Sequence, residues 1–344
     1  MIINEHLTRE DTNAIIFLDT YGFSPGIGMS IDPTYRNLLY KISRAYYIDN
    51  LTQKQIGKRY GLSRIKVSRL LQKARDLNVV QIIITPLDGA RVELEHEVAS
   101  RYGIAEVLTA APENYTKEAI LKALGPTAAE AWVRAMQGDE IVAITWGSTL
   151  LSVINNLPMK NWPEVRVVQC LGGLSPPDTD YNAAEQSRRI AQKFSAKPYL
   201  LPSPGIVANK SVREALMADP QVSKVLSLAA QADIAVVGIG VMTTDSLIVQ
   251  NDIFTPQEIQ RLKHKGAIGD IGLQVFDRDG QRIPDAVHDR IVGLDLEQIR
   301  KISRVIGVAG GEEKFEAIRA AVRGNLIDVL VTDDRTAQRL LQET

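Results

Sequence analysis

The segment from Leu51 to Ala74 has the pattern of two short helices joined by a tight turn. Thr52 stands where an N-cap would begin the first helix, and Ser63 can cap the second. Gly61 tolerates the positive φ that such a turn requires. In the second helix, four apolar residues recur at helical spacing and form one stripe: Val67, Leu70, Leu71 and Ala74. The segment therefore predicts a helix-turn-helix.

The same segment is basic, although the chain as a whole is nearly neutral. No acidic residue lies between Asp49 and Asp76, in a chain with 40 Lys+Arg and 41 Asp+Glu. The basic residues of this interval are Lys54, Lys58, Arg59, Arg64, Lys66, Arg69, Lys73 and Arg75. A single lysine here is well explained by solvation of a helix face. The cluster together with the turn predicts a surface that binds DNA phosphates.

The two helices would contact DNA in different ways. Side chains near the start of the second helix reach base edges in the major groove, where Arg can contact guanine and Ile65 a thymine methyl group. Lys54, Lys58, Lys73 and Arg75 lie farther out and are expected to hold phosphates. The candidate DNA-binding residues are Lys54, Lys58, Ser63, Arg64, Ile65, Lys66, Ser68 and Arg69.

Length and composition favour two domains of a cytoplasmic protein. The 344 residues exceed one small domain, and 45% of them are hydrophobic. One cysteine, Cys170, excludes an internal disulfide and a multi-cysteine metal site. The four histidines lack metal-binding spacing, so no metal is expected. We find no apolar run of membrane-spanning length and no signal peptide, and we expect no membrane association.

The chain divides into three parts in sequence order. Residues 1–32 resist assignment because glycine and proline interrupt them repeatedly. A DNA-binding domain is expected over 33–86, with a supporting helix at 33–47 and a β-branched strand or wing at 79–85. After a short linker, an effector and oligomerisation domain is expected over 90–344.

The third part alternates between helical segments and short apolar runs. Such alternation predicts an α/β domain with a parallel sheet that is covered on both faces. We predict helices at about 90–102 and 116–136, the second interrupted near Gly125 and Pro126, and strands at 105–110, 141–145, 165–171, 234–237, 305–308 and 327–331.

Four loops of this α/β part carry candidate ligand-binding residues. Three of them follow predicted strands, where open α/β sheets bind ligands. Glycines let the backbone approach a ligand, hydroxyls and a helix N-terminus suit phosphate, a carboxylate can accept hydrogen bonds from sugar hydroxyls, and a lysine can neutralise phosphate. The candidates are Gly147, Ser148 and Thr149, then Gly172 and Gly173, then Asp270, and finally Lys314. Each has an ordinary explanation when taken alone: a helix cap, a turn or an exposed lysine.

Other binding or catalytic motifs find little support. Gly238-Ile239-Gly240 begins like a dinucleotide fingerprint, but Thr243 stands where its third glycine belongs. Ser148 has no Gly-x-Ser-x-Gly context and no evident histidine partner, so an acyl-transfer triad is not expected.

From about Leu39 onward, the chain resembles the SorC family of bacterial sugar-responsive transcriptional regulators. The matching segments, in order, are LTQKQIGKRYGLSRIKVSRLL, WGSTL, AAQADIAVVGIG, KGAIGDI, VFDRDG, VAGGEEKFEAI and VTDDRTAQRLL. The resemblance implies a winged helix-turn-helix and an effector domain similar in fold to sugar-phosphate isomerases. It also implies tetramers on palindromic operators, and a phosphorylated sugar bound by Gly147, Ser148, Thr149, Asp270 and Lys314, with Gly172 and Gly173 as neighbours.

Three functions are therefore compatible with the sequence. The first is a non-enzymatic regulator, more readily a repressor than an activator, whose affinity for double-stranded operator DNA is set by a sugar phosphate. The second is a sugar-phosphate isomerase with an accessory DNA-binding domain, which would need a general base; Asp270 is the one candidate. The third is an architectural DNA-binding protein without a ligand, which would leave the glycine-rich loops without a role.

Overall fold

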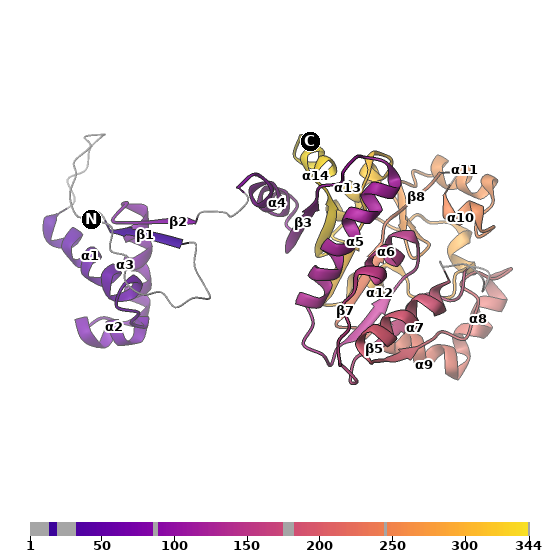
Figure 1. Cartoon of the computed structure of the whole chain (residues 1–344), viewed down its shortest axis with the longest axis horizontal. Coiled ribbons are helices and arrows are strands. Elements are labelled where there is room, and N and C mark those ends of the chain that lie inside the picture. Colours follow the sequence, from indigo (N-terminus) through magenta and orange to yellow (C-terminus); the bar gives the residue numbers. More distant parts are fainter. Residues whose placement is uncertain (1–13, 19–31, 85–88, 175–181, 244–245, 343–344) are drawn as a thin grey trace. The chain divides into compact units, whose positions relative to one another are not determined.

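The computed structural model describes residues 14–18, 32–84, 89–174, 182–243 and 246–342. The chain forms two compact units, Met1–Gly89 and Ala90–Thr344 (Figure 1). We refer to them as the N-terminal unit and the C-terminal unit, and describe each by itself. Among the described residues, no helix is long and apolar enough to cross a membrane.

The N-terminal unit is a three-helix domain with a two-stranded sheet. Its elements are α1 (Pro33–Tyr47), α2 (Gln53–Tyr60), α3 (Arg64–Asp76), β1 (Ala14–Leu18) and β2 (Val80–Ile84). Buried aliphatic residues from all three helices form its core, among them Leu39, Ile56 and Leu70. Within the stretch 1–32, which the sequence left unassigned, β1 pairs antiparallel with β2; residues 1–13 and 19–31 lie outside the described part.

The predicted helix-turn-helix is confirmed. Thr52 caps α2 in a capping box with Gln55, and the Ser63 side chain accepts from the Lys66 amide at the start of α3. Gly61 has φ +66° in the turn. Gly57 lies where α2 comes closest to the turn, since an added Cβ would stand 2.5 Å from the carbonyl oxygen of Leu62. The two helices can therefore keep this separation only with glycine at that position.

The C-terminal unit is built on a parallel sheet of seven strands, which confirms the α/β prediction. Its strand order is β3-β12-β11-β7-β4-β5-β6, and each neighbouring pair runs parallel. The strands are β3 (Glu106–Ala110), β4 (Ile141–Ile144), β5 (Arg166–Gln169), β6 (Lys197–Tyr199), β7 (Ile234–Gly238), β11 (Arg304–Val308) and β12 (Val329–Asp333). The order reverses between β7 and β4, and a ligand crevice is expected at such a point.

Helices and a smaller sheet complete this unit. The helices are α4 (Gly89–Tyr102), α5 (Lys117–Arg134), α6 (Ser148–Asn156), α7 (Ala183–Phe194), α8 (Lys210–Ala218), α9 (Pro220–Ala229), α10 (Leu247–Gln250), α11 (Pro256–His264), α12 (Leu296–Arg300), α13 (Phe315–Arg323) and α14 (Asp334–Gln342), with the 3₁₀ turns η1 (Ala286–Arg290) and η2 (Glu312–Lys314). The smaller antiparallel sheet has the order β10-β9-β8, from β8 (Gly240–Val241), β9 (Gly269–Ile271) and β10 (Gln274–Phe276).

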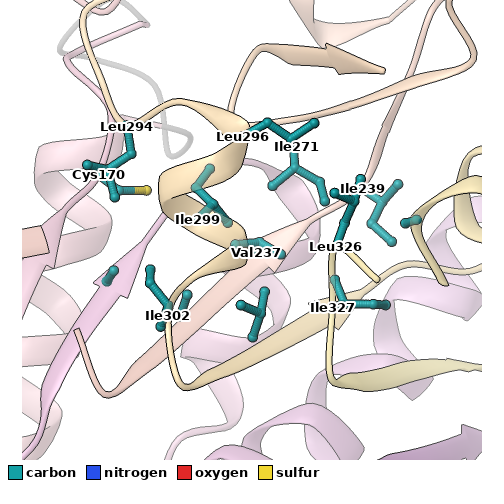
Figure 2. Close-up of a cluster of buried hydrophobic side chains, with 14 of the residues drawn as sticks. Cys170, Val237, Ile239, Ile271, Leu294, Leu296, Ile299, Ile302, Leu326 and Ile327 are labelled. Atoms are coloured by element: carbon teal, nitrogen blue, oxygen red, sulfur yellow. The ribbon is translucent and has the colours of Figure 1, made fainter. Parts of the chain in front are cut away.

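Both faces of the large sheet are covered by apolar cores. Alternate residues of β7 point to opposite sides: Val236 belongs to the core under α5, α6 and α7, and Val237 to the core under α9, α12 and α13. Figure 2 shows part of the second core, where Val237 lies among Ile299, Ile302 and Ile327. This double coverage explains why the strands read as continuous apolar runs rather than alternating ones.

The predicted interruption near Gly125 and Pro126 is wrong, because α5 runs unbroken through both residues. The helix packs closely on α6, and an added Cβ on Gly125 would stand 2.6 Å from Ser152 Oγ. That hydroxyl donates a 2.6 Å hydrogen bond to the Leu121 carbonyl. Tertiary packing therefore outweighs the local helix-breaking tendency of proline.

Candidate functional site

The basic helices of the N-terminal unit present every candidate DNA-binding residue to solvent. The exposed set is Lys54, Lys58, Ser63, Arg64, Ile65, Lys66, Ser68 and Arg69. Ile65 is 66% exposed, although the other aliphatic residues of α3 lie in the core. An aliphatic side chain held in solvent beside basic ones suits contact with a base edge. Arg75, expected at phosphate, is exposed and also donates to Tyr47 Oη and to Gln72 Oε1.

The C-terminal unit holds a cavity of about 120 Å³, which we call the Asp270 cavity. It lies where β4 and β7 end, on either side of the reversal in strand order. Its walls come from the loops after β4, β7 and β11, from β8 and β9 with residues that follow them, and from α5, α6 and α10. The wall residues are Lys117, Thr145, Trp146, Gly147, Ser148, Thr149, Gly238, Ile239, Gly240, Val241, Thr243, Ser246, Ile248, Asp270, Gly272, Glu313 and Lys314.

The loop after β4 presents a helix N-terminus to this cavity. Thr145 Oγ1 accepts from the Gly238 amide at 3.3 Å and fixes the loop against β7. Gly147 has φ +128° and is the N-cap of α6, which has no side-chain capping bond. The first amides of α6 therefore lack the usual capping oxygen, and they lie at the positive end of the helix dipole. This arrangement suits an anion.

Asp270 contributes a buried carboxylate to the same cavity. It is 5% exposed, and burial raises its pKa to about 6. Its Oδ2 accepts from the Leu273 amide at 2.9 Å, whereas Oδ1 has no hydrogen-bond partner among the described residues. The carboxylate packs against Gly240 across the β8–β9 pair, where an added Cβ would collide with Oδ1. Glycine at position 240 thus makes room for the acid.

Lys314 carries a positive charge to the same cavity. Its Nζ donates to the Ile239 carbonyl at 2.9 Å. Burial lowers the pKa of Lys314, and the nearby Asp270 opposes that change. Lys117, the first residue of α5, brings a second ammonium to the wall. The cavity therefore combines two cations, a helix N-terminus, the buried carboxylate of Asp270 and the more exposed carboxylate of Glu313.

A second cavity of about 390 Å³, which we call the Tyr115 cavity, adjoins the first through common wall residues. The two share Lys117, Ser148, Thr149, Glu313 and Lys314, which we call the shared wall. The Tyr115 cavity is lined in addition by Tyr115, Ile120, Leu121, Gly310, Gly311 and Glu312.

The predicted effector residues fall into two groups. One cavity brings together Gly147, Ser148, Thr149, Asp270 and Lys314. Gly172 and Gly173, expected as neighbours, line neither cavity. They pack against the 203–205 segment instead, and an added Cβ on Gly172 would stand 2.5 Å from the Pro204 carbonyl oxygen. Gly172 therefore serves close backbone packing, whereas Gly173 is exposed and a side chain there would meet only the Ser203 carbonyl oxygen, at 4.0 Å.

Sequence reasoning missed several wall residues. Lys117 carries no local signal because it resembles any first-turn lysine, and only the fold brings α5 beside α6. Gly238 and Gly240 belong to the incomplete dinucleotide motif, and both line the Asp270 cavity. Within the described residues, no group of three or more His, Cys, Asp or Glu side chains is placed to hold a metal ion.

Two family models match the chain, one on each unit. The family described as "Putative sugar-binding domain" matches residues 89–342, and Sigma-70, region 4, a helix-turn-helix region, matches residues 42–76. The first match covers the whole sheet and both cavities. The second covers the end of α1 together with α2 and α3.

Full-length relatives are similar over nearly the whole chain. The deoxyribonucleoside regulator of Bacillus subtilis (strain 168) is 30% identical, over 91% of this chain and 100% of the relative. The transcriptional regulator LsrR of Enterobacter sp. (strain 638) is 32% identical, over 90% of this chain and 94% of the relative. The alignments thus join the helix-turn-helix to the sugar-binding domain in one protein.

Solved structures give the same result. The full-length sorbitol operon regulator SorC from Klebsiella pneumoniae matches with a TM-score of 0.69 and 27% identity, over 89% of this chain and 99% of that one. The sugar-binding domain of a transcriptional repressor from Vibrio fischeri matches with a TM-score of 0.67 and 29% identity, over 73% of this chain and 98% of that one. The chain therefore belongs to the SorC family of sugar-binding, DNA-binding transcriptional regulators.

Proposed function

We propose that this protein is a cytoplasmic repressor of a carbohydrate-related operon and that a phosphorylated sugar controls its affinity for operator DNA. The observation that carries the proposal is the convergence of Lys117, Lys314 and the uncapped start of α6 on one cavity that also contains Asp270. Relatives named for deoxyribonucleosides and for the sorbitol operon support a sugar-related role, and a relative described as a repressor supports the sign.

Phosphate is the group that best fits the shared wall. The amides at the start of α6 and the hydroxyls of Ser148 and Thr149 can donate to its oxygens, and two ammonium groups can neutralise its charge. The free Oδ1 of Asp270 can accept hydrogen bonds from sugar hydroxyls. Ser246 Oγ, which lines the cavity and has no partner among the described residues, offers a further polar contact.

The N-terminal unit supplies the DNA contacts in this proposal. We place α3 in the major groove, with Arg64 and Arg69 at base edges and Lys58 at phosphate. A palindromic operator requires two such helices about 34–36 Å apart. The protein therefore acts as a dimer or as a tetramer of paired dimers, in line with the tetramer that the family resemblance implies.

Regulation follows if the effector binds one quaternary arrangement more tightly than the other. A coupling free energy of ~1–3 kcal/mol between the two sites changes DNA affinity by ~5–150-fold. No cofactor and no catalytic step are needed for such a switch.

Calorimetric titration of the full chain tests the effector class. The panel consists of sugar phosphates, the matching sugars without phosphate, and inorganic phosphate. Saturable binding that requires the phosphate group supports the proposal. Binding of neutral sugars alone would contradict a phosphorylated effector. Conversion of a bound sugar phosphate into its isomer, followed by NMR, would favour the isomerase with an accessory DNA-binding domain.

A further inference from the structure

The Tyr115 cavity is larger than the cavity that holds the predicted effector residues. Its volume is about 390 Å³, against about 120 Å³ for the Asp270 cavity. Small-molecule sites usually have ~300–1,000 Å³. A ligand confined to the Asp270 cavity would therefore be unusually small, whereas a ligand that also entered the Tyr115 cavity would have a site of ordinary size.

The walls of the Tyr115 cavity are fixed by contacts that need no ligand. Tyr115 donates a 2.7 Å hydrogen bond to Asp334 Oδ1, and the guanidinium of Arg335 lies 3.4 Å from its ring centroid. Burial and the hydrogen bond to Asp334 raise the pKa of Tyr115. Glu312 is paired with Arg339. The aromatic wall is thus held in place from outside the cavity, whereas the paired Glu312 side chain is 82% exposed.

The glycine loop of this cavity is also anchored. The buried carboxylate of Asp333 accepts from the Gly311 amide at 2.7 Å and from the Thr336 hydroxyl at 2.6 Å. An added Cβ on Gly310 would stand 2.7 Å from Asp333 Oδ2, and Gly311 has φ +98°. The loop is therefore drawn onto β12 and α14, and it leaves the cavity open. A compartment held open in this way loses little entropy when a ligand binds.

The chemistry of the lining is that of a site for a sugar. Tyr115, Ile120 and Leu121 give it apolar surface that suits the C–H face of a sugar. Glu312 offers carboxylate oxygens to hydroxyl groups. Glu313, on the shared wall, offers further acceptor oxygens to hydroxyl groups that lie near the boundary of the two cavities. Lys117 and Lys314, which are common to both cavities, keep the phosphate at the shared wall.

We infer that the Tyr115 cavity is a second compartment of the effector site, which takes a hydroxyl-bearing part of the ligand that extends past the shared wall. The effector class is accordingly a phosphorylated sugar of hexose size or larger, rather than a small phosphorylated polyol. This inference rests on the proposed sugar-phosphate function and adds the extent of the ligand to it.

The test fills the compartment and compares ligands of different size. Leu121→Trp places an indole in the Tyr115 cavity, and Met159→Trp adds the same group at a position that is 68% exposed and lines neither cavity. Calorimetry on the full chain uses inorganic phosphate, glycerol 3-phosphate and a set of hexose phosphates. We expect Leu121→Trp to weaken the binding of hexose phosphates at least tenfold and the binding of inorganic phosphate less than twofold. Met159→Trp should change neither affinity.

A milder variant keeps the test decisive if Leu121→Trp does not fold. Glu312→Gln retains the shape of the side chain and removes its charge. We expect this variant to weaken the binding of hexose phosphates about threefold, while inorganic phosphate binds with unchanged or higher affinity. Equal affinity of wild type and both variants for every hexose phosphate would overturn the second compartment but leave the proposed function intact. Failure of the wild type to bind any phosphorylated compound would refute the proposed function, and this inference with it.

Discussion

The Nζ of Lys314 donates a 2.9 Å hydrogen bond to the carbonyl oxygen of Ile239 and so joins the loop after β11 to the loop after β7. The same ammonium lines both cavities. The Ile239 carbonyl accepts one of the three protons of the Lys314 ammonium group, and the other two can reach a ligand. Lys314 thus serves two purposes: it holds two strand-end loops together and carries charge to the effector.

Replacement of Lys314 by Gln should abolish most of the effector affinity. A hydrogen bond to a charged group is worth ~1.5–3 kcal/mol, and a tenfold change in affinity corresponds to about 1.4 kcal/mol. We expect calorimetry to show at least a tenfold weaker affinity for the effector, with DNA affinity unchanged in its absence. The control is Lys301→Gln, an exposed lysine of the same unit. Effector affinity equal to that of wild type would remove Lys314 from the site.

Because of the buried carboxyl of Asp270, the free energy of unfolding should decrease as the pH rises from about 4 to about 6. Burial raises its pKa from 3.8 to about 6, so in this interval the folded chain keeps a proton that the unfolded chain has lost. The contribution of protonated Asp270 is complete below the unfolded pKa and is lost as the pH rises through the folded one, at most about 3 kcal/mol. Urea unfolding should show that Asp270→Asn reduces this loss and that Asp139→Asn, at an exposed site, does not. Parallel curves for wild type and Asp270→Asn would contradict the burial argument.

Addition of one methyl group at Gly240 should disturb Asp270. The new Cβ would collide with Asp270 Oδ1, and overpacking of this kind costs ~1–3 kcal/mol. We expect Gly240→Ala to lower the melting temperature and weaken effector binding. Gly238→Ala is the matched control for the melting temperature, because its Cβ would meet only the Trp146 carbonyl oxygen, at 3.9 Å. Equal melting temperatures for the two variants would show that the carboxylate can move away freely.

The basic residues of the N-terminal unit should separate into two classes in DNA binding. Arg64→Ala and Arg69→Ala should cost ~1–3 kcal/mol on the preferred operator and relax base preference. Lys58→Ala should weaken binding to all DNA sequences alike and lower the slope of log K against log salt concentration by about one. Anisotropy titrations with operator and scrambled DNA at several salt concentrations distinguish them. Sequence-independent losses in all three variants would reverse the placement of α3 in the groove.

The contact between α4 and α14 should carry part of the regulatory coupling. Arg101 of α4 donates to the Leu341 carbonyl and Tyr102 to the Leu340 carbonyl, at the end of the helix that begins with Asp334, the partner of Tyr115. Because α4 is the helix with which the C-terminal unit begins, we expect Arg101→Ala to reduce the effect of the ligand on DNA affinity while each separate affinity stays within twofold. Arg91→Ala, on the same helix, is the control. An unchanged effector response in Arg101→Ala would exclude this route.

The local features of the chain were predictable because neighbouring residues determine them. Thr52, Gly61 and Ser63 act on amides within three residues of themselves, and their caps and turn appear as expected. The alternation of helices and apolar strands likewise indicated a covered parallel sheet. Strand order did not follow, because nothing local specifies that β7 lies between β11 and β4.

The failures arise where distant residues determine the outcome. Packing of Gly125 on Ser152 keeps α5 whole, although the sequence favours a break. Lys117 joins the site only because α5 and α6 begin at the same edge of the sheet, and no local pattern marks it. Gly172 follows a strand, as ligand-binding glycines do, yet the Pro204 backbone fills the space beside it, and no local pattern indicates this contact.

One titration tests the central claim, that a sugar phosphate sets the affinity of this protein for operator DNA. Fluorescence anisotropy with labelled DNA from upstream of the neighbouring operon measures binding with and without each sugar phosphate. We predict tight, salt-sensitive binding that one phosphorylated sugar changes by at least ~5-fold and that Lys314→Gln makes insensitive to that sugar. Tight binding that no phosphorylated sugar changes would contradict the claim.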